Sequence, residues 1–78
     1  MPAEFDFARN IKEIERLKTG LVSGCAQVFE VMNQPQAGDG LPEALAEVVA
    51  CATALARRLG VREELLRETV RRKLYEEP

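Results

Sequence analysis

Acid–base catalysis or metal binding by this chain must depend on carboxylates, because histidine is absent from its 78 residues. A His-containing catalytic triad, a His-ligated zinc site and an imidazole general base are thereby excluded. Glu47 is the only charged residue between Ala44 and Ala56. If this segment is buried, the carboxylate must be paired, protonated, bound to a metal or directed into a cavity. The candidate ligands for a metal or substrate are therefore Glu47 and three residues expected near it: Gln27, Glu30 and Glu43.

Charge and composition limit the partners of this chain. Eleven basic and 13 acidic residues leave a net charge of −2 and a pI of about 5.1, which argues against binding of nucleic acid through its phosphates. No apolar run approaches the ~20 residues that a membrane span needs, and two cysteines are too few for a disulfide scaffold. We therefore expect a cytoplasmic protein with reduced thiols that binds neither nucleic acid nor membranes.

Helical periodicity extends through the first part of the chain. Apolar residues recur at steps of three and four from Phe7 to Met32, which predicts one long helix over about residues 7–33. Asp6 is the expected N-cap, after a loose lead-in of residues 1–6. Because Gly20 costs about 1 kcal/mol relative to alanine inside a helix, a kink or break near Thr19 and Gly20 is the alternative.

Two further helices are expected after a glycine- and proline-containing connection. The stretch "NQPQAGDG" predicts a loop over residues 33–40. A second helix over about 41–59 then begins with Pro42 in its first turn and ends at Gly60, a suitable C′ cap. A third, amphipathic helix over about 62–76 is expected to bury the apolar residues of its segment: Val61, Leu65, Leu66, Val70 and Leu74. The fold class is therefore all-α, in one domain of three helices.

The second helix is too apolar to be covered by its own chain. From Ala44 to Ala56 only Glu47 and Thr53 are not apolar, and a helix that is apolar nearly all round must be covered on most sides. A chain of 78 residues buries only about 60% of its unfolded surface. We therefore expect a multi-helix bundle built from several copies, as a homodimer or as a tetramer formed by a pair of dimers.

The short connection predicts that the first two helices are antiparallel. Folding them about a loop centred near residue 37 or 38 places position i opposite roughly 75 or 76 minus i. Cys25 is then level with Cys51, and Gln27, Glu30 and Glu47 lie within about a turn of one another. Both cysteines are expected to be small core residues.

These elements resemble the core of the MazG-type all-α nucleotide pyrophosphohydrolases. The similarity rests on "EALAEVVACATALARRLGV" followed by "REELLRETVRRKL" and spans about residues 10–75. In that family two helices carry acidic ligands for Mg²⁺, which neutralises a nucleoside triphosphate and positions an attacking water. The first helix carries two adjacent acids and a third acid four residues after the first, and the second helix carries two acids three residues apart. Hard oxygen ligands of this kind are those that Mg²⁺ prefers.

Most of the acids that the resemblance implies are replaced in this chain. Aligned on "QVFEVM", the first-helix positions are Ser23, Gly24 and Gln27, and the second-helix positions are Ala44 and Glu47. One carboxylate of the five remains, so that a magnesium site is implied only if these residues still function.

Two other acids could contribute to such a site. Moving the first-helix alignment by three residues gives Ala26, Gln27 and Glu30, which recovers one acid. Glu43 directly precedes Ala44 but points about 100° away from it around the helix.

The replaced turn "SGCAQ" has two interpretations. It is the remnant of an acidic metal-binding turn, or Ser23 and Gly24 are small because another helix crosses there and Gln27 only faces water or a polar pocket. Three functions follow: a catalytically degenerate oligomeric MazG-like protein with at most weak nucleotide or metal binding, an active Mg²⁺-dependent nucleoside triphosphate pyrophosphohydrolase, or a helical dimerisation module with no ligand.

Overall fold

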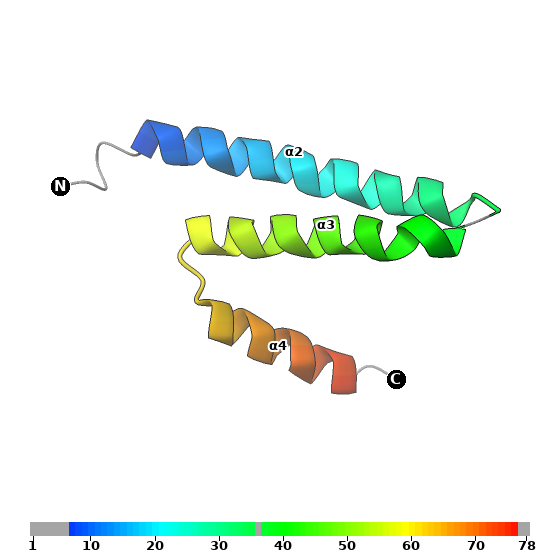
Figure 1. Cartoon of the computed structure of the whole chain (residues 1–78). Helices are drawn as coiled ribbons and strands as arrows, with labels where there is room; N and C mark the ends of the chain where they lie inside the picture. The colour runs from blue at the N-terminus through cyan, green and yellow to red at the C-terminus, as the bar shows by residue number, and fades with distance from the viewer. Residues whose placement is uncertain (1–6, 36, 77–78) are drawn as a thin grey trace.

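The computed structural model describes residues 7–35 and 37–76, and this part of the chain is all-α. It contains the helices α2 (Phe7–Met32), α3 (Ala37–Arg58) and α4 (Glu63–Glu76), as Figure 1 shows. The predicted helices are thus present, and each C-terminal end lies within one residue of its expected position. The expected lead-in and its N-cap Asp6 lie outside the described residues. None of the described helices has the length and hydropathy to cross a bilayer.

The helix α2 is continuous through both of its glycines, and the alternative of a break at Gly20 is wrong. A Cβ atom added at Gly20 would lie 3.1 Å from the Sγ atom of Cys51, and one added at Gly24 would lie 3.1 Å from a methyl group of Val48. Both glycines therefore face α3 and allow the two helices to approach closely. This packing offsets the helix propensity that each glycine loses, about 1 kcal/mol.

The loop predicted for residues 33–40 is wrong over its second half, because α3 begins at Ala37 rather than near Leu41. Pro42 therefore lies inside α3, where its missing N–H removes the bond to the carbonyl of Gly38. A Cβ atom at Gly40 would lie 3.7 Å from Val31, so the added turn packs against the end of α2. This tertiary contact outweighs the turn propensity of the glycines.

The register between α2 and α3 differs from the predicted one by about a helical turn. Facing pairs such as Gly20 with Cys51 and Val31 with Gly40 place position i opposite 71 or 72 minus i, because α3 begins four residues early. Cys25 is therefore not level with Cys51. Both thiols are free, Cys51 is buried, and Cys25 is exposed instead of being a core residue.

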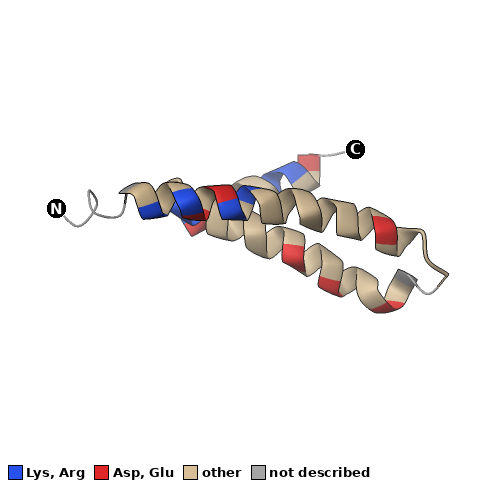
Figure 2. Cartoon of the chain, turned by 90° about the horizontal axis from the view of Figure 1, so that it is seen from above, with Lys and Arg blue, Asp and Glu red and all other residues tan. Residues whose placement is uncertain are grey.

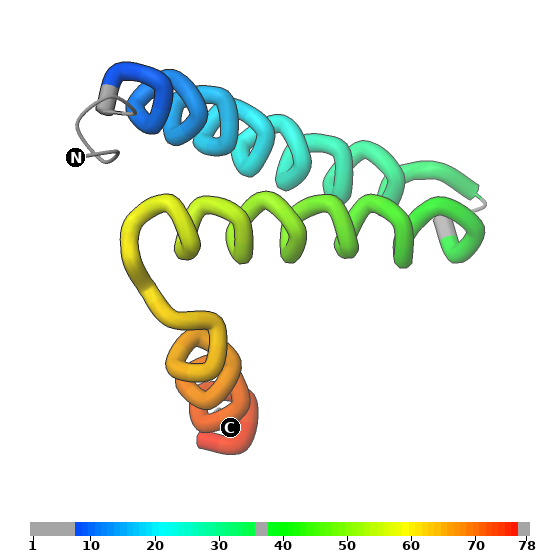
Figure 3. The backbone as a smooth tube through the Cα atoms, turned by 60° about the vertical axis from the view of Figure 1, so that its left-hand side comes forward, coloured from blue at the N-terminus to red at the C-terminus, as the bar shows by residue number. Residues whose placement is uncertain are grey.

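The three helices form a single layer, with α3 between α2 and α4 (Figures 1 and 3). The helix α4 packs against α3 and makes no contact with α2. The molecule measures 52 × 28 × 16 Å between Cα atoms, so it is elongated and narrower in one direction than in the other two. Its radius of gyration is 15.3 Å, against about 11.5 Å for a compact domain of this length.

A single layer of helices buries few side chains. The buried apolar residues of the described part are Leu17, Val28, Val31, Ala44 and Cys51. No residue of α4 is buried, so the expectation that this segment buries its apolar residues is wrong for the single chain: Val61, Leu65, Val70 and Leu74 are exposed and Leu66 is half-buried. The reason is geometric, because α4 has a neighbour only on the side of α3.

A hydrogen bond joins α2 and α3 at the end remote from their connection. Arg58 donates it to the side-chain oxygen of Asn10 at 3.2 Å.

A second polar contact lies within α2, where Arg16 donates hydrogen bonds to Glu13, one of them from Nε at 3.1 Å. These hydrogen bonds hold the pKa of Glu13 below its ordinary value and raise the pKa of Arg16.

Gly60 ends α3 as the sequence predicts. Its φ is +84°, the N–H of Val61 donates to the carbonyl of Ala56 at 2.9 Å, and the N–H of Gly60 donates to that of Arg57 at 3.2 Å. These are the two bonds of a Schellman motif, which requires a left-handed residue at C′. An ion pair of 3.1 Å between Arg57 and Glu63 spans the same turn.

Gly60→Ala is expected to lower the free energy of unfolding by about 1–2 kcal/mol, because an L-residue is strained in the left-handed region. The matched control is Gly38→Ala, since neither glycine has a heavy atom within 4 Å of an added Cβ and only Gly60 has a positive φ. Urea unfolding followed by circular dichroism at fixed chain concentration measures both. Equal effects at the two positions would contradict the capping role.

Gly24→Leu is expected to lower the free energy of unfolding by about 1–3 kcal/mol, because the added side chain forces α2 and α3 apart. The control Gly38→Leu adds the same side chain where space is open and should change stability far less. A second change, Val48→Ala, should restore part of the loss in the Gly24→Leu background. A Gly24→Leu protein as stable as the unmodified chain would show that the contact does not position the helices.

Candidate functional site

An open groove of about 490 Å³ runs between α2 and α3 on one side of the helix pair. Its volume lies within the range of small-molecule sites. The residues that line it come from both helices: Gly20, Ser23, Gly24, Gln27, Val31, Gly40, Glu43, Ala44 and Glu47.

The groove brings together nearly all the site residues predicted from the sequence. Ser23, Gly24 and Gln27 line it from α2, and Glu43, Ala44 and Glu47 line it from α3. Glu30 is not part of the lining. It follows Gln27 by three residues and therefore lies about 60° further round α2, on the side away from α3. Glu30 is exposed there.

The floor of the groove is made of small residues because the helices touch there. Gly24 is buried and Ala44 is 6% exposed. An added Cβ at Gly24 would meet the Val48 side chain at 3.1 Å, so a carboxylate at this position would be pressed against α3. The crossing of a second helix thus explains the small residue at Gly24.

Helix crossing does not explain the residues on the wall of α2. Ser23 and Gln27 are both exposed, and both line the groove. A larger or charged side chain would be accommodated at either position, since each side chain can extend into solvent. Packing therefore does not require a neutral side chain at either position.

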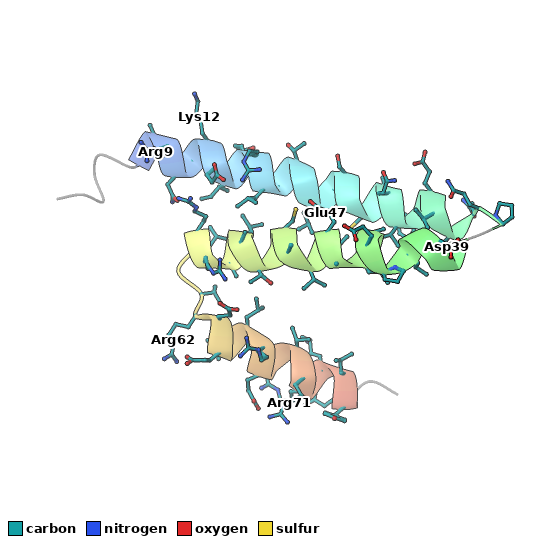
Figure 4. The ribbon with its side chains drawn as sticks, viewed as in Figure 1. Arg9, Lys12, Asp39, Glu47, Arg62 and Arg71 are labelled. Atoms are coloured by element: carbon teal, nitrogen blue, oxygen red, sulfur yellow. The ribbon has the colours of Figure 1, made fainter. Side chains whose placement is uncertain are left out.

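Glu47 is exposed and lines the groove, so of the alternatives left open by the sequence it is a carboxylate directed into a cavity. The groove is open to solvent, so the carboxylate stays hydrated and needs no partner to offset burial. Its Oε2 atom lies 3.8 Å from the Sγ atom of Cys51, one turn further along α3. In Figure 4 the side chain of Glu47 points into the space between α2 and α3.

The surroundings of the groove are negatively charged. The sequence has no lysine or arginine from position 19 to 56, whereas Asp39, Glu43 and Glu47 follow one another at four-residue intervals along α3. Figure 2 shows these acidic residues along α3 and the basic residues of α2 gathered toward its N-terminal end. The groove therefore offers no side-chain cation to a phosphate group.

The oxygen donors of the groove do not fit the resident magnesium site that the family resemblance implies. Two carboxylates, Glu43 and Glu47, lie on α3, and α2 adds only the Ser23 hydroxyl and the Gln27 amide. Among the described residues no group of three or more His, Cys, Asp or Glu side chains is placed to hold a metal ion. Mg²⁺ takes hard oxygen ligands in near-octahedral geometry and is reluctant to lose its water.

Three residues that line the groove were not predicted as site residues from the sequence: Gly20, Val31 and Gly40. The four-residue spacing of Gly20 and Gly24 was the available signal, since small residues one turn apart mark a close helix contact. The early start of α3 was not detectable, because Gly38 and Gly40 favour a loop in isolation.

The sequence matches the model of the MazG-like family over residues 7–78. Comparisons with curated proteins and with solved structures gave no match. The family match covers all three helices and every residue that lines the groove. The chain therefore belongs to the MazG-like family.

Proposed function

We propose that this chain is a catalytically degenerate MazG-like protein that functions as a homo-oligomer and binds nucleotides or metal ions weakly at most. One observation carries the proposal. Of the five positions at which the family resemblance implies acids, four are Ser23, Gly24, Gln27 and Ala44, and only Glu47 is a carboxylate. All five line the same groove, so no other residue substitutes for the replaced acids on the α2 side.

Electrostatics supports weak nucleotide binding. A nucleoside triphosphate brings several negative charges to a groove bordered by Glu43 and Glu47, with no lysine or arginine between positions 19 and 56 to attract them. In an enzyme that hydrolyses triphosphates, bound metal ions neutralise this charge. Two carboxylates without a basic partner do not supply the same field.

The shape of the chain supports the homo-oligomer. Five buried apolar residues form the described core, which is a small core for an independent domain of this length. A helix layer must bury its apolar stripe against another layer, and this chain supplies one layer only. A homodimer, or a tetramer made of two dimers, provides the second layer.

The packing at Gly24 favours a second candidate function, a helical dimerisation module with no ligand. Close contact with Val48 is sufficient reason for a small residue there, and a module of this kind requires no metal ligands. The two candidates differ in whether the groove can hold a cation when carboxylates are placed on its α2 wall.

Under the degenerate-site proposal, Mg²⁺-dependent release of pyrophosphate from canonical and modified nucleoside triphosphates should not exceed the blank. Glu47→Ala should leave that background unchanged. The measurement is a coupled pyrophosphate assay over a triphosphate panel, with each protein checked for helicity. Turnover by the unmodified chain that disappears in Glu47→Ala would establish the active enzyme instead.

The double substitution Ser23→Glu and Gln27→Glu should create saturable Mg²⁺ or Mn²⁺ binding, because it adds two carboxylates opposite Glu43 and Glu47. Both positions are exposed, so the fold should tolerate the change. The matched control is Thr19→Glu with Ala26→Glu, which adds equal charge on exposed positions of α2 outside the groove. Titration calorimetry with each cation distinguishes them. Equal heats for both variants would favour the ligand-free module.

A further inference from the structure

We infer that α4 is a lid, which moves from its place beside α3 and closes over the exposed apolar side of the α2–α3 pair. The apolar face, as we call it, lies opposite the groove and consists of exposed residues from both helices: Val22, Cys25, Phe29 and Met32 of α2, and Leu45 and Val49 of α3. The inference concerns the single chain and goes beyond the proposed function.

On α2 the apolar face and the groove lie on opposite sides of the line of contact with α3. Residues 22, 25, 29 and 32 follow at steps of three, four and three, which is one stripe of a helix. Val28 is buried against α3. Gln27 precedes it and Phe29 follows it, each about 100° around the helix but in opposite directions. Gln27 lines the groove, so Phe29 faces the other side.

The same relation holds on α3. Val48 packs against the core, Glu47 precedes it and lines the groove, and Val49 follows it. Because α2 and α3 are antiparallel and have the same hand, residues that follow the contact line on either helix face the same side. Leu45 and Val49 therefore join the stripe of α2 in one surface.

The helix α4 already borders the apolar face. A cavity of about 350 Å³ lies between α3 and α4, and its lining includes Val49 and Thr53 of α3 and Leu66 and Val70 of α4. Val49 belongs to the apolar face as well. The surface of α3 beside α4 is therefore continuous with the apolar face, and closure requires a rotation of α4 around α3 without detachment from it.

The apolar stripe of α4 is covered only in part. Leu66, Val70 and Leu74 follow at steps of four and lie on one side of the helix. Leu66 is half-buried, whereas Leu74 is 70% exposed, because α4 diverges from α3 toward its C-terminal end (Figure 1). Val22 on the apolar face is 71% exposed. Two apolar surfaces of the same chain are thus uncovered next to each other.

The registers of the three helices match the uncovered part of the stripe to the centre of the apolar face. The lining of the α3–α4 cavity pairs Val70 with Val49, and α4 runs back along α3 (Figures 1 and 3). Position j of α4 is therefore level with about 119 minus j of α3, which pairs Leu74 with Leu45. Position 45 lies opposite position 26 or 27 of α2. A closed α4 thus brings Leu74 next to Cys25.

Closure leaves the charges opposite the stripe in solvent. Glu68 and Arg72 are each two residues from Val70 and therefore lie about 160° from it around α4. Glu63 and Arg67 lie nearer the stripe, at the start of α4, and form an ion pair of 3.5 Å with each other. The apolar face contains no charged residue. Closure therefore buries apolar surface without burying an unpaired charge.

The exposed area favours closure. The chain has an accessible surface of 6453 Å², whereas a compact monomer of 8.7 kDa has about 4,700 Å². Removal of apolar area from water is favourable roughly in proportion to that area. A lid of one helix that covers part of the apolar face moves the chain toward the compact value.

The connection between α3 and α4 permits the movement. Four residues separate the two helices, and the hydrogen bonds at Gly60 cap α3 without extending to α4. The ion pair of Arg57 with Glu63 spans the connection, but its side chains are 64% and 45% exposed, and such pairs contribute little. Rotation about the backbone of Val61 and Arg62 is therefore sufficient to redirect α4.

The test measures whether Cys25 meets a thiol on the stripe of α4 within one chain. Leu74→Cys is combined with Cys51→Ala, and the protein is mixed with a large excess of a chain carrying Cys25→Ser and Cys51→Ala, so that a disulfide forms only within a chain. Equilibration with reduced and oxidised glutathione, read by intact mass, gives the effective concentration of the two thiols. The matched control is Arg72→Cys with Cys51→Ala, which places the thiol about 160° from position 74 around α4.

Closure predicts an effective concentration about tenfold or more higher for Leu74→Cys than for Arg72→Cys. Circular dichroism checks that both proteins keep their helicity. Equal values at the two positions would overturn the inference, because α4 would then move without a preferred side. Absence of the disulfide from both proteins would also overturn it, because α4 makes no contact with α2 in the open arrangement. Neither result bears on the pyrophosphate assay, which decides the proposed function separately.

Discussion

The close contact of α2 with α3 at Gly20 and Gly24 organises the helix pair. An added Cβ at either position would lie 3.1 Å from a side-chain atom of α3, so only glycine allows this approach without a shift of the neighbour. The contact determines which residues of the two helices face each other. It therefore decides that the wall formed by Ser23 and Gln27 is opposite the wall formed by Glu43 and Glu47.

The same contact divides the helix pair into two sides with different chemistry. Residues that precede the contact line form a groove with two carboxylates on its α3 wall, and residues that follow it form an apolar surface. Among the described helices, α4 packs beside α3 and makes no contact with α2, so it does not cover the second side of the α2–α3 pair. The exposed Val22, Phe29 and Val49 are thus a direct result of the flat arrangement of α2, α3 and α4.

The chain belongs to the MazG-like family, but its groove lacks most of the acids that the family resemblance implies. The family match extends over residues 7–78 and so includes both helices of the hairpin. The groove has the position expected for a two-helix ligand site, yet its α2 wall carries a hydroxyl and an amide. Gly24 has a packing reason for its size, whereas exposed Ser23 and Gln27 have none. Substitutions at Ser23 and Gln27 can therefore test whether the groove binds a cation without disturbing the helix contact.

The helices and most of the groove residues can be predicted from local patterns in the sequence. Apolar periodicity predicts the three helices, and Gly60 is the predicted C′ residue of α3. The residue types and spacing also indicate Ser23, Gln27, Glu43 and Glu47, which line the groove. These features are local, because helix phase and capping depend on neighbours within a few residues. Local patterns do not predict that α3 begins at Ala37 or that the register is a turn from the predicted one. They also do not predict that Glu30 lies outside the groove, or that Cys25 and Glu47 are exposed. Each of these depends on how closely two distant segments approach, and that distance is determined by side-chain volume at the helix contact.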